Sequence, residues 1–151
     1  MTQLIEQLKR HEGYRKHQYA DTVGLMTIGY GYCLSHNPLR LSDEKLKRIT
    51  ENGISKEEAE EILNQCVIQT HNKLALTLSF FTALSTVRQE CLVNMAFNIG
   101  VAGLMEFKHM NFCLRAGDYE GAAREMRDSK WAFQVKGRAA ELAEQMRSGE
   151  Y

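Results

Sequence analysis

The strongest periodic pattern of apolar residues lies between residues 56 and 74. Its apolar positions follow a spacing of i, i+3, i+4, i+7 and i+8, and they are Ala59, Ile62, Leu63, Cys66 and Val67. This spacing places them on one face of a helix. Ser55 and Glu58 precede the pattern with the spacing of a capping box. We therefore expect a long helix over 56–74 with one buried face.

A second pattern predicts a helix that is buried on all sides. Residues 87–99 are apolar around nearly the whole helical circumference, which is typical of a central core helix. Thr86 and Gln89 have the spacing of a second capping box. Gly100 and Gly103 are expected to break this helix.

Shorter amphipathic segments complete the helical part. We expect a helix from Thr2, as its N-cap, to near Gly13, and another after the N-cap Ser42. Residues 104–116 predict a further helix, followed by one that Asp118 caps and that runs to about residue 129. A last helix holds the apolar positions Ala139, Ala140, Leu142, Ala143 and Met146.

Residues 14–35 have a different character. Turn residues and glycines alternate there with β-branched and aromatic side chains, which predicts a hairpin or small sheet. The predicted fold is therefore α+β and mainly helical, with one domain over 1–151. Within it we expect a mixed N-terminal lobe at 1–55, a linking helix at 56–74 and a helical lobe at 75–151.

Composition narrows the classes of function. Nineteen Lys and Arg balance nineteen Asp and Glu, for a formal net charge of zero, whereas a dedicated nucleic-acid binder normally has a basic excess. No run approaches the roughly 20 apolar residues of a membrane span, and no signal peptide is apparent. We therefore expect no nucleic-acid partner, no stable membrane insertion and synthesis in the cytosol.

Several fragments resemble cofactor motifs without completing them. His11-Glu12 begins like a zinc-protease motif, but Arg15 stands where the second histidine is needed. Gly29-x-Gly31 is followed by Leu34 where a dinucleotide motif requires glycine. The four cysteines, Cys33, Cys66, Cys91 and Cys113, show no CxxC spacing and are interpreted as buried free thiols. No metal and no cofactor are expected.

The pattern with catalytic potential is Glu12, Asp21 and Thr27. Glu12 lies at the end of the first predicted helix, and the other two lie in the predicted hairpin. Glycoside hydrolysis needs a protonated carboxyl that releases the leaving oxygen and an ionised one that handles water, and a hydroxyl can help to hold that water. From the spacing alone, the alternative is that Glu12 and Asp21 are ordinary surface carboxylates.

The residues around this spacing resemble the phage-type lysozymes (endolysins), close to those of the T-even bacteriophages. The matching segments are Glu12-Gly13-x-Arg15, Tyr19-x-Asp21-Thr22-x-Gly24, Thr27-Ile28-Gly29-Tyr30-Gly31, Ile54–Glu60, Asn94–Asn98, Gly100–Gly103 and Ser129–Trp131. They follow one another in the family's order over nearly the whole chain.

The resemblance implies a lysozyme-like fold and a muramidase that hydrolyses the β-1,4 bond between N-acetylmuramic acid and N-acetylglucosamine. It implies that Glu12 is the general acid and that Asp21, with Thr27, positions and activates the attacking water. The family is regarded as inverting, which requires carboxyl groups about 6.5–9.5 Å apart.

The resemblance also implies substrate contacts and a supporting residue. Phe97, Asn98, Cys33 and Phe107 match positions of the sugar groove, although the residue types at 33 and 107 differ from the family's. Arg138 matches an arginine that pairs with the acid, and we interpret it as holding Glu12 in place. By residue type alone, Phe97 and Trp131 are more typical of a core than of a sugar site.

The expected role is host lysis at the end of a phage infection. The enzyme would act as a monomer on peptidoglycan, accumulating in the host cytoplasm until a separate holin releases it to the periplasm. Two other readings are a lytic transglycosylase, which leaves an anhydro sugar, and a wall-binding module with an inactive site. The presence of Asp21 and Thr27 beside Glu12 argues against both.

Overall fold

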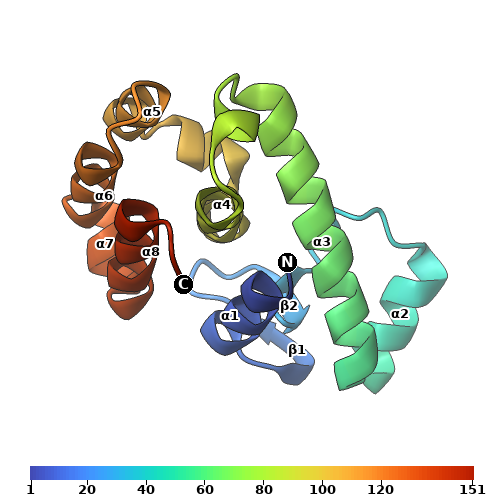
Figure 1. Cartoon of the computed structure of the whole chain (residues 1–151). Coiled ribbons are helices and arrows are strands. Elements are labelled where there is room, and N and C mark those ends of the chain that lie inside the picture. The colour runs from blue at the N-terminus through green and yellow to red at the C-terminus, as the bar shows by residue number, and fades with distance from the viewer. The chain divides into compact units, whose positions relative to one another are not determined.

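The computed structural model describes residues 1–151 (Figure 1). These residues form two compact units, Met1–Ile68 and Gln69–Tyr151. The chain is mainly helical with one small sheet, as predicted. The division falls within the long helix α3 (Lys56–Thr77). No helix is both long enough and apolar enough to span a membrane.

The first unit combines two helices and a sheet with the beginning of α3. The helices are α1 (Thr2–Glu12) and α2 (Asp43–Asn52), and the strands are β1 (Arg15–Ala20), β2 (Met26–Gly29) and β3 (Tyr32–Cys33). The strands form an antiparallel sheet in the order β1-β2-β3. Its core contains the fully buried side chains of Leu4, Leu8, Ile28, Ile49, Ile54 and Leu63.

The second unit is helical. After α3 come a short 3₁₀ helix (Phe81–Ala83) and the helices α4 (Thr86–Met105), α5 (Lys108–Arg115), α6 (Tyr119–Arg127), α7 (Lys130–Val135) and α8 (Gly137–Ser148). Helix α8 packs against α4, α6 and α7, and α5 packs against α6 (Figure 1). Residues 90–96 of α4 are all buried, which confirms the predicted core helix.

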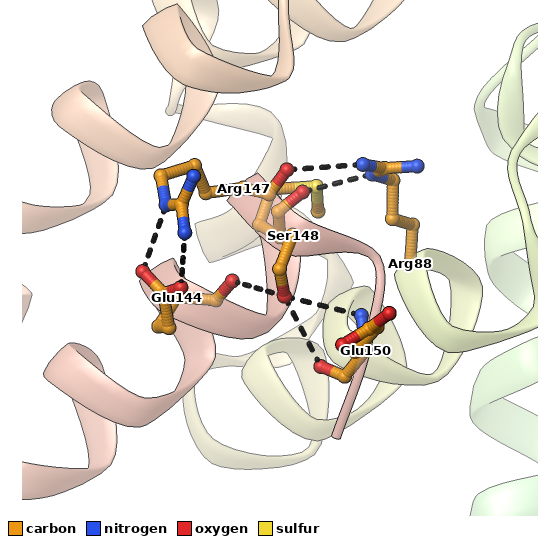
Figure 2. Close-up of polar contacts among 6 residues, drawn as sticks. Arg88, Glu144, Arg147, Ser148 and Glu150 are labelled. Carbon is orange, nitrogen blue, oxygen red and sulfur yellow. Dashed lines mark hydrogen bonds and ion pairs between the residues drawn. The ribbon is translucent and has the colours of Figure 1, made fainter.

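Arg88 of α4 holds the C-terminal end of α8 (Figure 2). Its Nε donates to the carbonyl of Met146 at 2.8 Å, and its Nη2 donates to that of Arg147 at 3.1 Å. The last carbonyls of a helix have no partner inside the helix, so these bonds satisfy two of them. The guanidinium group also lies 3.6 Å from the ring centroid of Tyr119.

Three predicted helix caps are confirmed. The side chains of Ser42, Ser55 and Asp118 accept from the backbone N–H groups of Lys45, Glu58 and Gly121 respectively. The five predicted apolar positions of α3 are all buried, whereas Thr70, the next position of the predicted face, is half-buried. All four cysteines are free, but only Cys66 and Cys91 are fully buried, whereas Cys33 and Cys113 are half-buried.

Two predicted caps are wrong by one residue. Helix α1 begins at Thr2 with Met1 at the N-cap, and no side chain caps it. The N-cap of α4 is Ser85 rather than Thr86. The expected capping box does not form there, because the N-cap Ser85 accepts from the N–H of Arg88 and Arg88, not Gln89, stands at the third helical position. The Gln89 amide donates to the carbonyl of Leu84 at 2.9 Å.

The segment after α4 also differs from the prediction. Gly100 interrupts the helix, with φ 79°, but Gly103 remains inside it and the helix continues to Met105. The helix predicted over 104–116 is present, but its start is wrong, because α5 begins only at Lys108 and ends at Arg115. The side chain of Asn111 donates to the Leu104 carbonyl at 3.1 Å, which satisfies a backbone acceptor at the end of α4.

Candidate functional site

The carboxyl group of Glu12 lies against the turn between β2 and β3. Glu12 is the last residue of α1 and is half-buried. A β-carbon at Gly31 would stand 2.8 Å from its Oε2, closer than β-carbons come in proteins, and 3.2 Å from its Cδ, which is a tight contact. Gly31 also has φ 78°, a conformation that favours glycine. A glycine at this position therefore makes room for the carboxyl group.

Asp21 is fixed in the turn that joins β1 to β2. Its Oδ1 accepts from the backbone N–H groups of Val23, at 2.9 Å, and Leu25, at 2.8 Å. Its own N–H donates to the Leu25 carbonyl at 2.9 Å. Because these bonds use only one carboxylate oxygen, the side chain is oriented while Oδ2 can accept a hydrogen bond from water or a ligand.

Thr27 lies in the middle of a row that crosses the sheet. It pairs with Tyr19 on β1 and with Cys33 on β3. Residues that pair directly across neighbouring strands project from the same face, so these three side chains are neighbours. Thr27 is buried, and its Oγ1 donates to the Leu25 carbonyl at 3.1 Å. Two predicted site residues, Thr27 and Cys33, are thus adjacent.

The Tyr19 phenol is affected by the charges of both Glu12 and Asp21. Burial raises the pKa of its phenol, and the charges of Glu12 and Asp21 raise it further, while Arg15 opposes the shift. The Arg15 guanidinium lies 5.0 Å from the centroid of the Tyr19 ring. The charges of Glu12 and Asp21 therefore both affect the same phenol. Tyr19 belongs to the segment that matched the lysozymes, yet the residue pattern gave it no role of its own.

Four further predicted residues lie in Gln69–Tyr151, where Trp131 links two of them. The indole N–H of Trp131 donates to Oδ1 of Asn98 at 2.7 Å. The Trp131 ring meets Phe107 edge-on, with centroids 6.2 Å apart. Phe97, just before Asn98, is half-buried. Arg138, the fourth, lies on α8 and is treated below.

A pocket of about 340 Å³ opens beside this aromatic pair. Phe107 and Trp131 line it together with charged side chains of both signs from α5 to α7, among them Lys108, Glu125 and Asp128. Trp131 is buried, as its residue type predicts, but it also forms a wall of this pocket. The sequence pattern did not assign it to a binding site.

Arg138 is anchored on α4. Its Nε and Nη2 donate to Oδ1 of Asn94 at 3.0 and 2.8 Å, and Nη2 also donates to the Asn94 carbonyl at 3.2 Å. Asn94 is fully buried, so the guanidinium group is held firmly within its own unit. The predicted pairing of Arg138 with Glu12 joins residues of different units and stays a prediction.

The chemistry available in Met1–Ile68 is that of an acid and a base around a hydroxyl. A threonine hydroxyl and a phenol share one face of a small sheet, and two carboxyl groups lie at its turns. No group of three or more His, Cys, Asp or Glu side chains is arranged to hold a metal ion. Proton transfer and the orientation of water are therefore what these side chains can supply.

The chain is similar to one protein family and to several known proteins. The family model described as "Phage lysozyme" matches residues 9–148. The chain is 36% identical over 155 residues to "Pre-baseplate central spike protein Gp5" of Enterobacteria phage T4, a match that covers 92% of this chain and 26% of that protein. The chain thus spans about a quarter of the length of the spike protein.

Two shorter relatives match over most of their length. The chain is 26% identical over 163 residues to "Probable T4-type lysozyme 1" of Dictyostelium discoideum, covering 99% of this chain and 96% of that protein. It is 28% identical over 153 residues to "Probable T4-type lysozyme 2" of the same organism, covering 92% and 90%.

Proposed function

The chain belongs to the phage lysozyme family, and from this premise we propose that it hydrolyses the β-1,4 bond between N-acetylmuramic acid and N-acetylglucosamine. Membership of the family makes it a glycoside hydrolase of the lysozyme type, which acts on peptidoglycan. The finer assignment is supported by the position of Glu12 beside the β2–β3 turn, of Asp21 in the β1–β2 turn and of Thr27 on β2 between them in the sheet.

Glu12 is the general acid in this proposal. Its protonated carboxyl gives a proton to the glycosidic oxygen as the bond to the anomeric carbon breaks. A water molecule attacks that carbon from the opposite side and passes a proton to the Asp21 carboxylate. The product sugar therefore has an inverted anomeric configuration, and the enzyme regains its starting state when a proton returns from Asp21 to Glu12 through solvent.

The hydrogen bonds at Asp21 and Thr27 support this division of roles. The Thr27 hydroxyl uses its proton on the Leu25 carbonyl, so it can only accept a hydrogen bond from the water. The free Oδ2 of Asp21 also accepts from the water. A water that donates both hydrogens in this way presents a lone pair to the anomeric carbon.

Substrate contacts are proposed for Cys33, Phe97, Asn98 and Phe107. Asn98 uses its amide oxygen to accept from Trp131, so its NH₂ group is left to donate to the carbonyl of an acetamido substituent. Phe107 and Trp131 supply an apolar wall for a sugar ring. Arg138 is proposed to position Glu12.

The biological role that we propose is that of an endolysin, active as a monomer. It would be made in the host cytoplasm, pass the membrane through a separate holin and act in the periplasm. The 36% identity to a phage spike protein favours a second candidate role, that of a lysozyme carried on the phage particle. Mass spectrometry of purified particles separates the two, because only the second role requires the protein in the particle.

The first experiment compares wild type with Glu12→Gln on outer-membrane-permeabilised Gram-negative cells. We expect wild type to lower the turbidity and the variant to lose nearly all activity. Glu6→Gln is the matched control, because Glu6 lies on the same helix and only pairs with Lys9 at the surface. An active Glu12→Gln variant would refute the assignment of the acid.

The products decide between the possible reactions. Reducing muramic acid ends with an inverted anomer, seen by NMR directly after cleavage, are expected for the proposed hydrolysis. Anhydro ends would identify a lytic transglycosylase. Folded wild type that binds purified sacculi without cleaving them would identify a wall-binding module.

A further inference from the structure

We propose that Tyr19 is a further substrate-contacting residue, whose phenol hydroxyl donates a hydrogen bond to the sugar bound between Glu12 and Asp21. The inference rests on the proposed function, because it takes these two carboxyl groups as the reacting pair. Tyr19 would bind the sugar without acting as the acid, which is Glu12, or activating the water, which is the role of Asp21 and Thr27.

Tyr19 is exceptional within its strand. Every other residue of β1 is exposed, and Tyr19 alone is half-buried. The position of this aromatic ring in the sheet accounts for its partial burial. Tyr19 pairs with Thr27, and Thr27 pairs with Cys33, so the ring lies on the face of the sheet that carries the proposed water site.

The hydroxyl of Tyr19 is a donor without a partner in the chain. The Tyr14 hydroxyl donates to the Ile54 carbonyl at 2.5 Å and that of Tyr32 donates to Asn37 at 2.6 Å, whereas no residue binds the Tyr19 hydroxyl. Asp21 directs Oδ1 to backbone N–H groups instead. A half-buried hydroxyl near two carboxylates, bonded to neither, is available to whatever group comes between them.

The charges around Tyr19 keep this hydroxyl protonated. Burial raises the pKa of the phenol above its ordinary value near 10, and the charge of Glu12 and, to a smaller extent, that of Asp21 raise it further, while Arg15 lowers it. The phenol is therefore a donor at any pH near neutrality. Among the groups that a sugar presents here, hydroxyl, ring and acetamido oxygens all accept such a bond.

Arg15 sets the orientation of the ring. Its guanidinium group lies 5.0 Å from the ring centroid and covers one face. This contact involves the ring and leaves the hydroxyl unused. The sugar then meets the hydroxyl and the remaining face of the ring.

Binding to an inactive enzyme tests the proposal separately from catalysis. Calorimetry would compare Glu12→Gln with Glu12→Gln/Tyr19→Phe, using a purified tetrasaccharide of alternating N-acetylglucosamine and N-acetylmuramic acid. Loss of one neutral hydrogen bond is expected to weaken the Kd about three- to tenfold. Glu12→Gln/Tyr19→Leu, which also removes the ring, should weaken it further. Glu12→Gln/Tyr14→Phe is the matched control and should bind as tightly as Glu12→Gln.

The thermal midpoint separates binding from stability. Tyr19→Phe should unfold at the wild-type temperature, because the hydroxyl has no partner in the folded chain. If Glu12→Gln/Tyr19→Phe binds the tetrasaccharide with the same Kd as Glu12→Gln, the proposal is overturned, whether or not the thermal midpoint of Tyr19→Phe falls. Absence of tetrasaccharide binding by Glu12→Gln also overturns it. Failure of the proposed function itself is recognised independently, by an active Glu12→Gln enzyme.

Discussion

The carboxyl group of Glu12 occupies the space where a side chain at Gly31 would begin, with Oε2 2.8 Å from the position of a β-carbon there. The absence of a side chain at residue 31 therefore leaves the space that this carboxyl group fills. This contact with Gly31 is one of shape.

Gly31→Ala should displace the acid. The new methyl group must push the carboxyl group away, and φ 78° costs a non-glycine residue about 1–2 kcal/mol. We expect at least a tenfold loss of kcat in a turbidity assay, together with a lower thermal midpoint. Gly117→Ala is the control, because Gly117 has φ 76° and open space around its β-position. Equal losses of activity in both variants would contradict the proposed contact.

Thr27→Ala should remove the acceptor that holds the attacking water. A group that orients the reacting water is worth about a hundredfold in rate, so kcat should fall by that order while KM changes little. Stability should fall by only about 1 kcal/mol, because the Leu25 carbonyl keeps its bond from the Asp21 N–H. Thr27→Ser retains the hydroxyl and should recover most of the rate; if Ser and Ala behave alike, the hydroxyl has no such role.

Asn98→Asp should separate substrate binding from folding. Aspartate keeps an oxygen that accepts from the Trp131 indole but has no N–H to offer an acetamido group. We expect KM to rise several-fold with the thermal midpoint nearly unchanged. Asn98→Ala should raise KM and also lower the midpoint, because the Trp131 N–H loses its partner. An unaltered KM in both variants would remove Asn98 from the binding site.

Arg88→Met should loosen the C-terminal end of α8 (Figure 2). It removes two hydrogen bonds from a charged donor and the contact with the Tyr119 ring. We expect urea denaturation to show a loss of about 2 kcal/mol in the free energy of unfolding. Arg147→Met is the control, because Arg147 makes its side-chain bonds to exposed Glu144 at the surface and such pairs contribute little. Similar losses in both variants would contradict this account.

Tyr151 should make stability sensitive to alkali. Its hydroxyl donates to buried Glu90, and burial followed by this carboxylate raises its pKa well above the value near 10 of an unfolded chain. The folded chain then holds the proton more tightly, so the stabilisation is complete below about pH 10 and is lost as the pH rises further. Urea denaturation should show a shallower alkaline loss for Tyr151→Phe than for wild type. Identical slopes would exclude Tyr151 as a source of this dependence.

Local patterns predict much of this fold because they reflect local physics. The buried face of α3 follows from helical spacing, and Ser42, Ser55 and Asp118 cap helices because each can accept from a backbone N–H three residues on. The cap of α4 is not decided locally, because Ser85 and Thr86 are both suitable residues. In the structure Ser85 is the N-cap and accepts from the N–H of Arg88.

The site could be predicted only in part. The spacing of Glu12, Asp21 and Thr27 suggested a pair of carboxyl groups with a hydroxyl, and the sheet register makes Thr27 and Cys33 neighbours. The parts played by Tyr19 and Trp131 depend on contacts with residues distant in sequence, such as Thr27 across the sheet and Asn98 from another helix. Residue type alone describes both side chains as ordinary aromatics.

The boundary within α3 has an evolutionary consequence. The proposed reacting groups are all encoded before residue 68, and the aromatic pocket is encoded entirely after it. A genetic crossover within the codons of α3 would join the first part of one chain to the second part of another inside one helix. It would replace the aromatic pocket together with Arg138, the proposed positioning residue, while keeping Glu12, Asp21 and Thr27. The proposed reacting groups and the residue proposed to position the acid would then come from different parents.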